Sequence, residues 1–196
     1  MFVILLLAAG EGTRFRDAGG HSHKLLAEVT PGRTVLRQAC ETLLTVGWPV
    51  HVVMGAEESG IRNALDGLPV HFIPNPDAAS GLSSTIRRGV AATNDADGWL
   101  LALADMPFIQ PSTVHQVADA LQAGAPVAFA SCQGKRGHPV GFAAHFYTEL
   151  VSLAGDSGAQ KILAAHAEAC VAVHVNDQGI LRDVDVPADL LPDSAP

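Results

Sequence analysis

Aspartates and basic residues at separate points of the sequence fit metal-assisted phosphate chemistry. Asp105 directly follows an apolar run, and the segment Asp183–Asp185 lies near the C-terminal end, before a proline. Magnesium is held in proteins by one or two carboxylates together with phosphate oxygens, so these aspartates predict a metal site. Arg14 and Lys24 supply positive charge that suits a triphosphate. The alternative for Asp105 is that it caps the helix predicted after Pro111 or simply ends a strand.

A glycine-rich loop follows the first apolar run of the chain. Gly10 and Gly12 come directly after residues 2–8, and glycines there let the backbone turn tightly and present its N–H groups to phosphates. A dinucleotide-binding loop would need a small residue where Phe15 stands. A P-loop would need a glycine before Lys24 and a hydroxyl residue after it, and the sequence has neither. The loop therefore predicts a phosphate cradle of another kind.

Three further segments carry polar side chains with weaker signals. Residues 80–85 place small hydroxyl side chains at the start of a predicted helix, where they can cap the helix or contact a ribose or base. His138 stands between a glycine and a proline, and a single histidine of this kind is more often structural than catalytic. His21 and His23 lie in a glycine-rich loop, so we expect them to be solvated and not to bind a metal.

The composition excludes several classes of protein. The formal net charge of −8 argues against nucleic acid or an anionic membrane as a partner, because such surfaces select basic patches. The three cysteines are far apart and form no C-x-x-C pair, which predicts neither a disulfide framework nor a zinc site. No basic residue precedes the first apolar run, so a signal peptide is not expected. These features together predict a cytoplasmic protein.

Strand-like and helix-like segments alternate along the chain, which is typical of a mostly parallel sheet covered by crossover helices. Strands are predicted at residues 2–8, 50–54, 70–73, 98–104, 126–130 and 170–175. Amphipathic helices are predicted at residues 35–44, 61–65, 86–91 and 114–121. We expect one domain over residues 1–191 and a disordered tail at 192–196. In such sheets ligands bind beyond the carboxyl ends of the strands.

Six motifs, taken in order, give the sequence a resemblance to a known family. They are Ala8-Ala9-Gly10-x-Gly12-x-Arg14 with Lys24-Leu25-Leu26, Gly81-Leu82-Ser83-Ser84, Asp105-Met106-Pro107, Gly137-His138-Pro139-Val140, Gly155-Asp156-x-Gly158-Ala159 and Asp183-x-Asp185-x-Pro187-x-Asp189-Leu190. This arrangement resembles the molybdopterin cytidylyltransferase branch of the MobA-like NTP transferases. The resemblance implies an α/β fold, three-layer and Rossmann-like with a mostly parallel central sheet. It also implies magnesium-dependent transfer of CMP from CTP to the terminal phosphate of molybdenum-loaded molybdopterin, with release of pyrophosphate.

The resemblance also assigns roles to individual residues. It implies nucleotide binding by Leu7, Ala8, Ala9, Gly10, Gly12, Thr13, Arg14, Lys24, Gly81, Ser83 and Ser84. It makes Arg14, Lys24 and Asp105 the catalytic residues, and Asp105 and Asp185 the magnesium ligands. It places the acceptor at Gly137, His138 and Pro139. Ala9 favours CTP, because relatives that use GTP typically carry glycine at this position.

The sequence departs from the family pattern in two places, and two other functions stay open. Residues 16–23 make the loop before Lys24 longer than usual, and Val186 stands where the family generally has threonine. One alternative is a nucleotidyltransferase that uses another NTP, or a sugar or polyol phosphate as acceptor. The other is a non-catalytic carrier of the molybdenum cofactor. A molybdoenzyme client or its chaperone is a further partner that the resemblance suggests.

Overall fold

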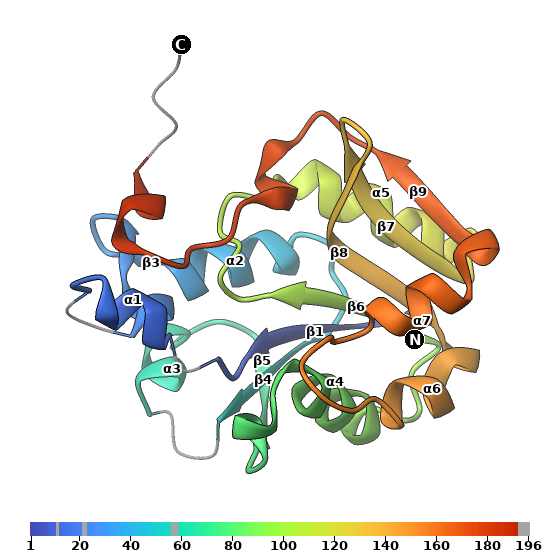
Figure 1. The fold of residues 1–196 in the computed structure, drawn as a ribbon, viewed down its shortest axis with the longest axis horizontal. Coiled ribbons are helices and arrows are strands. Elements are labelled where there is room, and N and C mark those ends of the chain that lie inside the picture. The colour runs from blue at the N-terminus through green and yellow to red at the C-terminus, as the bar shows by residue number, and fades with distance from the viewer. Residues whose placement is uncertain (11, 21–22, 56–58, 192–196) are drawn as a thin grey trace.

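The computed structural model describes residues 1–10, 12–20, 23–55 and 59–191. A seven-stranded sheet in the order β5-β4-β1-β6-β8-β7-β9 forms its centre (Figure 1). The strands are β1 (Val3–Ala8), β4 (Val50–Gly55), β5 (Val70–Asn75), β6 (Gly98–Leu103), β7 (Val127–Cys132), β8 (Lys135–Ala143) and β9 (Cys170–His174). Neighbouring strands are parallel except around β8, which is antiparallel to both β6 and β7. A short antiparallel pair, β2 (Glu28–Thr30) and β3 (Arg33–Thr34), lies apart from this sheet.

Strand β1 shows why the sequence forms a parallel sheet with both faces covered. All six of its residues are buried, and it pairs with β4 on one side and β6 on the other. Ile4 and Leu6 belong to the hydrophobic core on one face, and Leu5 and Leu7 belong to the core on the other face. A continuous apolar run is what a strand buried on both faces requires.

Helices cover both faces of the sheet and give three layers. The α-helices are α1 (Thr13–Asp17), α2 (Val35–Leu44), α3 (Ser59–Ala64), α4 (Leu82–Ala92), α5 (Pro111–Gln122), α6 (Tyr147–Val151) and α7 (Gln160–Ala165). Figure 1 shows α2 and α5 on one side of the sheet and α4 and α6 on the other. Leu36 of α2 and Val117 of α5 pack in one core, and Ile86 of α4 and Leu150 of α6 pack in the other. The expected α/β architecture is confirmed.

The structure confirms the predicted strands and adds three that the sequence analysis did not predict: the short pair β2 and β3, and one strand of the central sheet. Each of the predicted strands is present, with ends shifted by one or two residues. The additional strand of the central sheet is β8, which contains Gly137, Pro139 and Gly141. Glycine and proline are depleted in strands, so the local sequence gives little strand signal here. Gly141 is needed because a Cβ atom would come within 2.2 Å of the Leu121 side chain on α5.

Two other expectations concern the tail and the membrane. The predicted disordered tail at residues 192–196 lies outside the described residues. Within the described ranges, no helix is long and apolar enough to cross a membrane.

A buried carboxylate joins the end of the sheet to helix α5. Asp177, which follows β9, is 3% exposed. It accepts hydrogen bonds from the Gln110 N–H at 2.9 Å, the Thr113 hydroxyl at 2.7 Å and the Gly179 N–H at 2.9 Å. Asp105 does not cap this helix: the N-cap residue is Gln110, which has no side-chain cap bond and whose N–H is held by Asp177.

We expect Asp177→Ala to lower the free energy of unfolding by about 2–4 kcal/mol, because buried donors would be left without an acceptor. Chemical denaturation of both proteins measures this difference. Asp119→Ala removes an exposed carboxylate from the same helix and should change the free energy by less than about 0.5 kcal/mol. Equal effects of the two substitutions would contradict the structural role of Asp177.

Candidate active site

A cavity of about 420 Å³ opens beyond the carboxyl ends of β1 and β6. Its lining consists of Leu7, Ala9, Gly10, Ala78, Ala79, Gly81, Leu82, Thr85, Leu103 and Asp105. These residues come from the loop after β1, the 3-10 helix η2 (Ala78–Ser80), the start of α4 and the end of β6. Ligands bind at this edge in open α/β sheets, so the cavity lies where the sheet topology predicts.

Three carboxylates gather at the end of β6. One oxygen each of Asp105, Asp183 and Asp185 lies within 4.8 Å of the others. Figure 1 shows the C-terminal segment between η5 (Gln178–Leu181) and η6 (Pro187–Leu190), drawn in red, running past the end of β6 toward α1. The Val184 N–H donates to the Asp105 carbonyl at 2.8 Å, so a backbone hydrogen bond joins the two parts of the cluster.

Residues 183–185, which carry two of the three carboxylates, are also held from their C-terminal side. The Asp189 carboxylate accepts hydrogen bonds from the N–H of Asp185 at 2.9 Å and from the N–H of Val186 at 2.8 Å. These bonds use backbone N–H groups and require no side-chain hydroxyl at position 186. The substitution of valine for the usual threonine therefore leaves the position of Asp185 supported.

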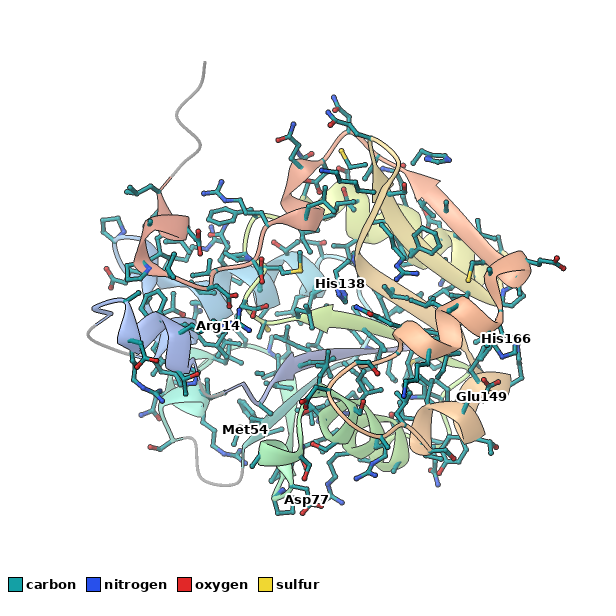
Figure 2. All side chains as sticks on the ribbon, in the orientation of Figure 1. Arg14, Met54, Asp77, His138, Glu149 and His166 are labelled. Atoms are coloured by element: carbon teal, nitrogen blue, oxygen red, sulfur yellow. The ribbon has the colours of Figure 1, made fainter. Side chains whose placement is uncertain are left out.

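Two basic side chains neutralise part of this negative charge. Lys24 Nζ lies 2.6 Å from Asp105 Oδ2 and 3.1 Å from Asp185 Oδ1, and Arg14 forms an ion pair with Asp185. The Lys24 side chain is 12% exposed, whereas that of Arg14 is 77% exposed. Lys24 is thus a fixed part of the cluster, and Arg14 is a solvated side chain that reaches it. Figure 2 shows Arg14 on the α1 side of the site.

The charges in the cluster shift one another's proton affinities. Burial acts to lower the pKa of Lys24, but Asp105 and Asp185 outweigh burial and raise it above its ordinary value. Partial desolvation raises the pKa of Asp183, and the carboxylates of Asp105 and Asp185 raise it further. Lys24 is therefore firmly protonated, while the carboxylates repel one another and favour a further cation.

The donor set of the cluster fits a hard divalent cation. The Oδ1 atom of Asp105 is buried and has no hydrogen-bond partner within the described part of the chain. An unpaired carboxylate oxygen in such a position is costly unless a cation or a donor completes it. Carboxylate oxygens are the ligands that magnesium and related ions prefer. Asp105, Asp183 and Asp185 are the residues that would hold the ion.

The glycine loop places its first residues in the cavity. Ala9 and Gly10 line it, and Gly12 has a φ of 64°, in the left-handed region that favours glycine. A Cβ atom on Gly12 would lie 3.1 Å from Lys24 Cγ, so the loop and the lysine pack closely. Of the other residues predicted to bind nucleotide here, Leu7 lines the cavity, Ala8 is buried in β1, and Thr13 and Arg14 are exposed on α1.

The hydroxyl residues at the start of α4 differ from one another. The Ser84 hydroxyl contacts the Gly81 carbonyl at 2.8 Å, the Asp77 carbonyl at 2.9 Å and the Asn75 amide at 3.0 Å, so its hydrogen bonds are used within the protein. Ser83 is 1% exposed, and its hydroxyl has no partner among the residues described. Thr85 lines the cavity instead, and it belongs to the hydroxyl segment 80–85 predicted from the sequence, although the family resemblance named only Ser83 and Ser84.

The predicted acceptor segment is part of strand β8, beside a second cavity of about 170 Å³. Gly137 and His138 line this cavity and Leu7 borders both cavities, whereas Pro139 is buried without lining either. His138, labelled in Figure 2, forms a hydrogen bond with the Leu101 backbone, and burial lowers the pKa of its ring. Its Nδ1 atom is buried without a partner in the described chain.

The structure changes two expectations about polar residues. Asp183 joins the carboxylate cluster, although the family resemblance named only Asp105 and Asp185 as ligands. The motif contained Asp183 two residues before Asp185, and in an extended backbone residues i and i+2 point to the same side, so this spacing is the signal that could have identified Asp183. His23 is only partly solvated, because its ring is half-buried and bonded to Gly10 and Leu25, whereas His21 lies outside the described residues.

Comparison with known proteins identifies the family. The family model of the MobA-like NTP transferase domain matches residues 4–170. A curated relative, nicotine blue oxidoreductase of Paenarthrobacter nicotinovorans, is 30% identical over 189 residues, which cover 92% of this chain and 90% of the relative.

Solved structures agree with this family. A nucleotidyl transferase from Methanothermobacter superposes with a TM-score of 0.82 at 25% identity, covering 96% of this chain and 94% of that chain. A Mycobacterium tuberculosis protein in complex with manganese superposes with a TM-score of 0.74 at 23% identity, covering 96% of this chain and 91% of that one. The family match over most of the chain and the shared fold lead to one conclusion: this chain belongs to the MobA-like NTP transferase family and is a nucleotidyltransferase.

Proposed function

We propose that this protein transfers CMP from CTP to the terminal phosphate of molybdenum-loaded molybdopterin, with magnesium as cofactor and pyrophosphate as the second product. The observation that carries the proposal is the set of three carboxylates and Lys24 at the rim of a cavity that the glycine loop also lines. Nucleotidyl transfer needs an α-phosphorus beside a metal and positive charge around the leaving pyrophosphate. This arrangement offers a site for the metal and the positive charge for the pyrophosphate.

The nucleotide has one orientation that matches the charges. Its triphosphate belongs beside Gly10, Arg14 and Lys24, where backbone and basic groups meet. Its sugar and base then extend toward residues 78–82, on the neutral side of the cavity. The first turn of α4 lies at the positive end of the helix, and Thr85 is the hydroxyl residue there that lines the cavity, whereas Ser83 is buried and does not.

Nucleotide choice and the acceptor form the specific part of the proposal. Ala9 lines the cavity, and the family resemblance associates alanine at this position with CTP. The acceptor is assigned to the side of His138, whose neutral ring offers Nδ1 as a hydrogen-bond acceptor. The cavity at His138 borders the nucleotide cavity at Leu7, Leu82 and Leu103, so two ligands can meet between them.

The reaction requires alignment more than proton transfer. The terminal phosphate of the acceptor is already a nucleophile at neutral pH, so no side chain has to act as a base. Asp105, Asp183 and Asp185 hold the cation, and Lys24 and Arg14 stabilise the charge on the departing pyrophosphate. When bound, magnesium supplies charge neutralisation at the phosphate oxygens.

The first experiment separates the alternatives. Pyrophosphate release is measured with CTP, GTP, ATP and UTP, each with molybdenum-loaded molybdopterin, a sugar phosphate or a polyol phosphate. Release confined to CTP and molybdopterin supports the proposal. Pyrophosphate release with another nucleotide or acceptor assigns the protein a different nucleotidyltransferase activity. Binding of molybdopterin without pyrophosphate release supports a cofactor carrier.

We expect Asp105→Asn to lower turnover by at least about 10²-fold, because the amide removes the negative charge that would hold the metal, and the metal supplies the positive charge that stabilises the transition state. Asp95→Asn, an exposed residue at the opposite edge of the sheet, is the control and should leave turnover unchanged. Steady-state pyrophosphate release measures both. If Asp105→Asn keeps turnover within a few-fold of the parent, Asp105 does not hold a catalytic metal.

We expect Lys24→Met to change metal and nucleotide binding in opposite directions. The Lys24 ammonium occupies the oxygens of Asp105 and Asp185, so its removal should tighten the binding of Mn²⁺ alone, by about threefold or more. The same change should weaken the binding of CTP in the presence of magnesium by about tenfold or more, because a phosphate contact is lost. Titration with Mn²⁺ and with CTP measures both constants, and parallel changes would contradict this competition.

We expect Asp183→Asn to weaken the binding of Mn²⁺ by about tenfold, because it removes one of three clustered carboxylates. The same titration measures this effect with the folded protein and needs no acceptor. Asp156→Asn, an exposed aspartate of the family motif outside the cluster, serves as the matched control. Unchanged Mn²⁺ affinity in Asp183→Asn would limit the metal site to Asp105 and Asp185.

A further inference from the structure

His23 connects the two ends of the loop between β1 and η1 (Lys24–Leu26). Its Nε2 atom lies 2.9 Å from the Gly10 carbonyl oxygen, and its Nδ1 atom lies 3.3 Å from the Leu25 nitrogen. A carbonyl oxygen can only accept, and a backbone N–H can only donate. The two bonds together therefore require the neutral ring with its proton on Nε2.

The environment of His23 favours this neutral form. Burial lowers the pKa of the ring, the bond to Gly10 acts in the opposite direction, and the charges of Arg16 and Lys24 lower it further. The ring rests on a rigid base, because Leu25 is 2% exposed and packs in the hydrophobic core. The bond to Leu25 thus ties the ring to η1, and the same ring reaches the Gly10 carbonyl.

His23 lies between two groups that the proposed nucleotide site uses, because it is bonded to Gly10 and directly precedes Lys24. Gly10 lines the 420 Å³ cavity, and Lys24, the next residue after His23, contacts Asp105 and Asp185. His23 itself is not among the residues that line this cavity. The Gly10 carbonyl is therefore bonded to a side chain outside the cavity lining, which satisfies an oxygen that would repel a phosphate if it turned inward.

We propose that His23 is a positioning residue that holds Gly10 and Lys24 in register and so keeps the triphosphate-binding groups assembled before the nucleotide arrives. This inference rests on the proposed binding of a nucleotide triphosphate in the cavity. Its physical basis is preorganisation, because groups that are already in place lose less conformational entropy when the ligand binds. His23 does not touch the reacting atoms, so it should affect nucleotide binding more than the rate of the chemical step.

Two conservative variants separate the bond to Gly10 from the bond to Leu25. Glutamine places an amide N–H near the position of Nε2, so His23→Gln keeps a donor for the Gly10 carbonyl. Asparagine places a carbonyl oxygen near the position of Nδ1, so His23→Asn keeps only the acceptor for the Leu25 N–H, which caps η1. His23→Ala removes both hydrogen bonds. The control is His166→Ala, which removes a histidine whose partner is Glu149, at the protein surface.

The experiment is a titration of each variant with CTP and magnesium, together with its unfolding temperature, KM and kcat. We expect His23→Ala and His23→Asn to raise the dissociation constant about tenfold, and His23→Gln and His166→Ala to stay within about threefold of the parent. KM should follow the dissociation constant, while kcat changes less. His23→Asn should also unfold at the parent temperature, which shows that the loss of affinity is not a loss of folding.

The outcomes distinguish this inference from the proposed function. If the parent binds CTP and His23→Asn binds it as tightly as His23→Gln, the bond to Gly10 does not position the loop and the inference is wrong. If affinity falls only in step with the unfolding temperature, His23 has a merely structural role and the inference is also wrong. If the parent binds no nucleotide in the presence of magnesium, the proposed function fails first, and this inference with it.

Discussion

Charge compensation between Lys24 and the carboxylates of Asp105 and Asp185 is the interaction on which the site depends. Carboxylates held within 4.8 Å of one another repel strongly in a partly desolvated place, so the cluster is stable only with a cation among them. The buried ammonium of Lys24 supplies one positive charge, and Arg14 supplies a second at the surface. The same basic groups are the ones that a triphosphate would recruit. In the proposed function, a metal ion and its nucleotide would replace this internal ion pair.

The sheet makes this cluster possible by bringing distant segments to one edge. Asp105 is placed by β6, whose parallel pairing with β1 also puts Gly10 at the same edge. Segment 183–185 arrives from the C-terminal end and is joined to Asp105 by a backbone hydrogen bond. Asp177, in the turn before this segment, is bonded to Gln110 and Thr113 at the start of α5 and so holds that turn against the helix. A rigid scaffold of this kind lets short polar loops keep their geometry without packing of their own.

The antiparallel strand β8 contributes the residues that line the second cavity. It enters the sheet between β6 and β7 and brings His138 next to the nucleotide cavity. Gly137 permits this approach, because a Cβ atom there would lie 2.2 Å from the Ile180 carbonyl oxygen in η5. The glycine of the motif is thus required by packing, while the adjacent histidine carries the unpaired nitrogen. Neighbouring residues of one motif therefore differ: Gly137 serves packing, and His138 is the residue to which the proposed function assigns the acceptor.

The sequence by itself determined the buried parallel strands, the amphipathic helices and the presence of Asp105 after β6, because periodicity and apolar runs are local properties. It did not predict β8, whose glycines and proline carry no strand signal and whose pairing with β6 and β7 is a tertiary contact. Only the tertiary structure brought Asp183 into the cluster and bonded His23 to Gly10. These contacts join residues that are far apart in the chain, or depend on the direction of a side chain. The spacing of residues along the sequence gives neither their distance in space nor that direction.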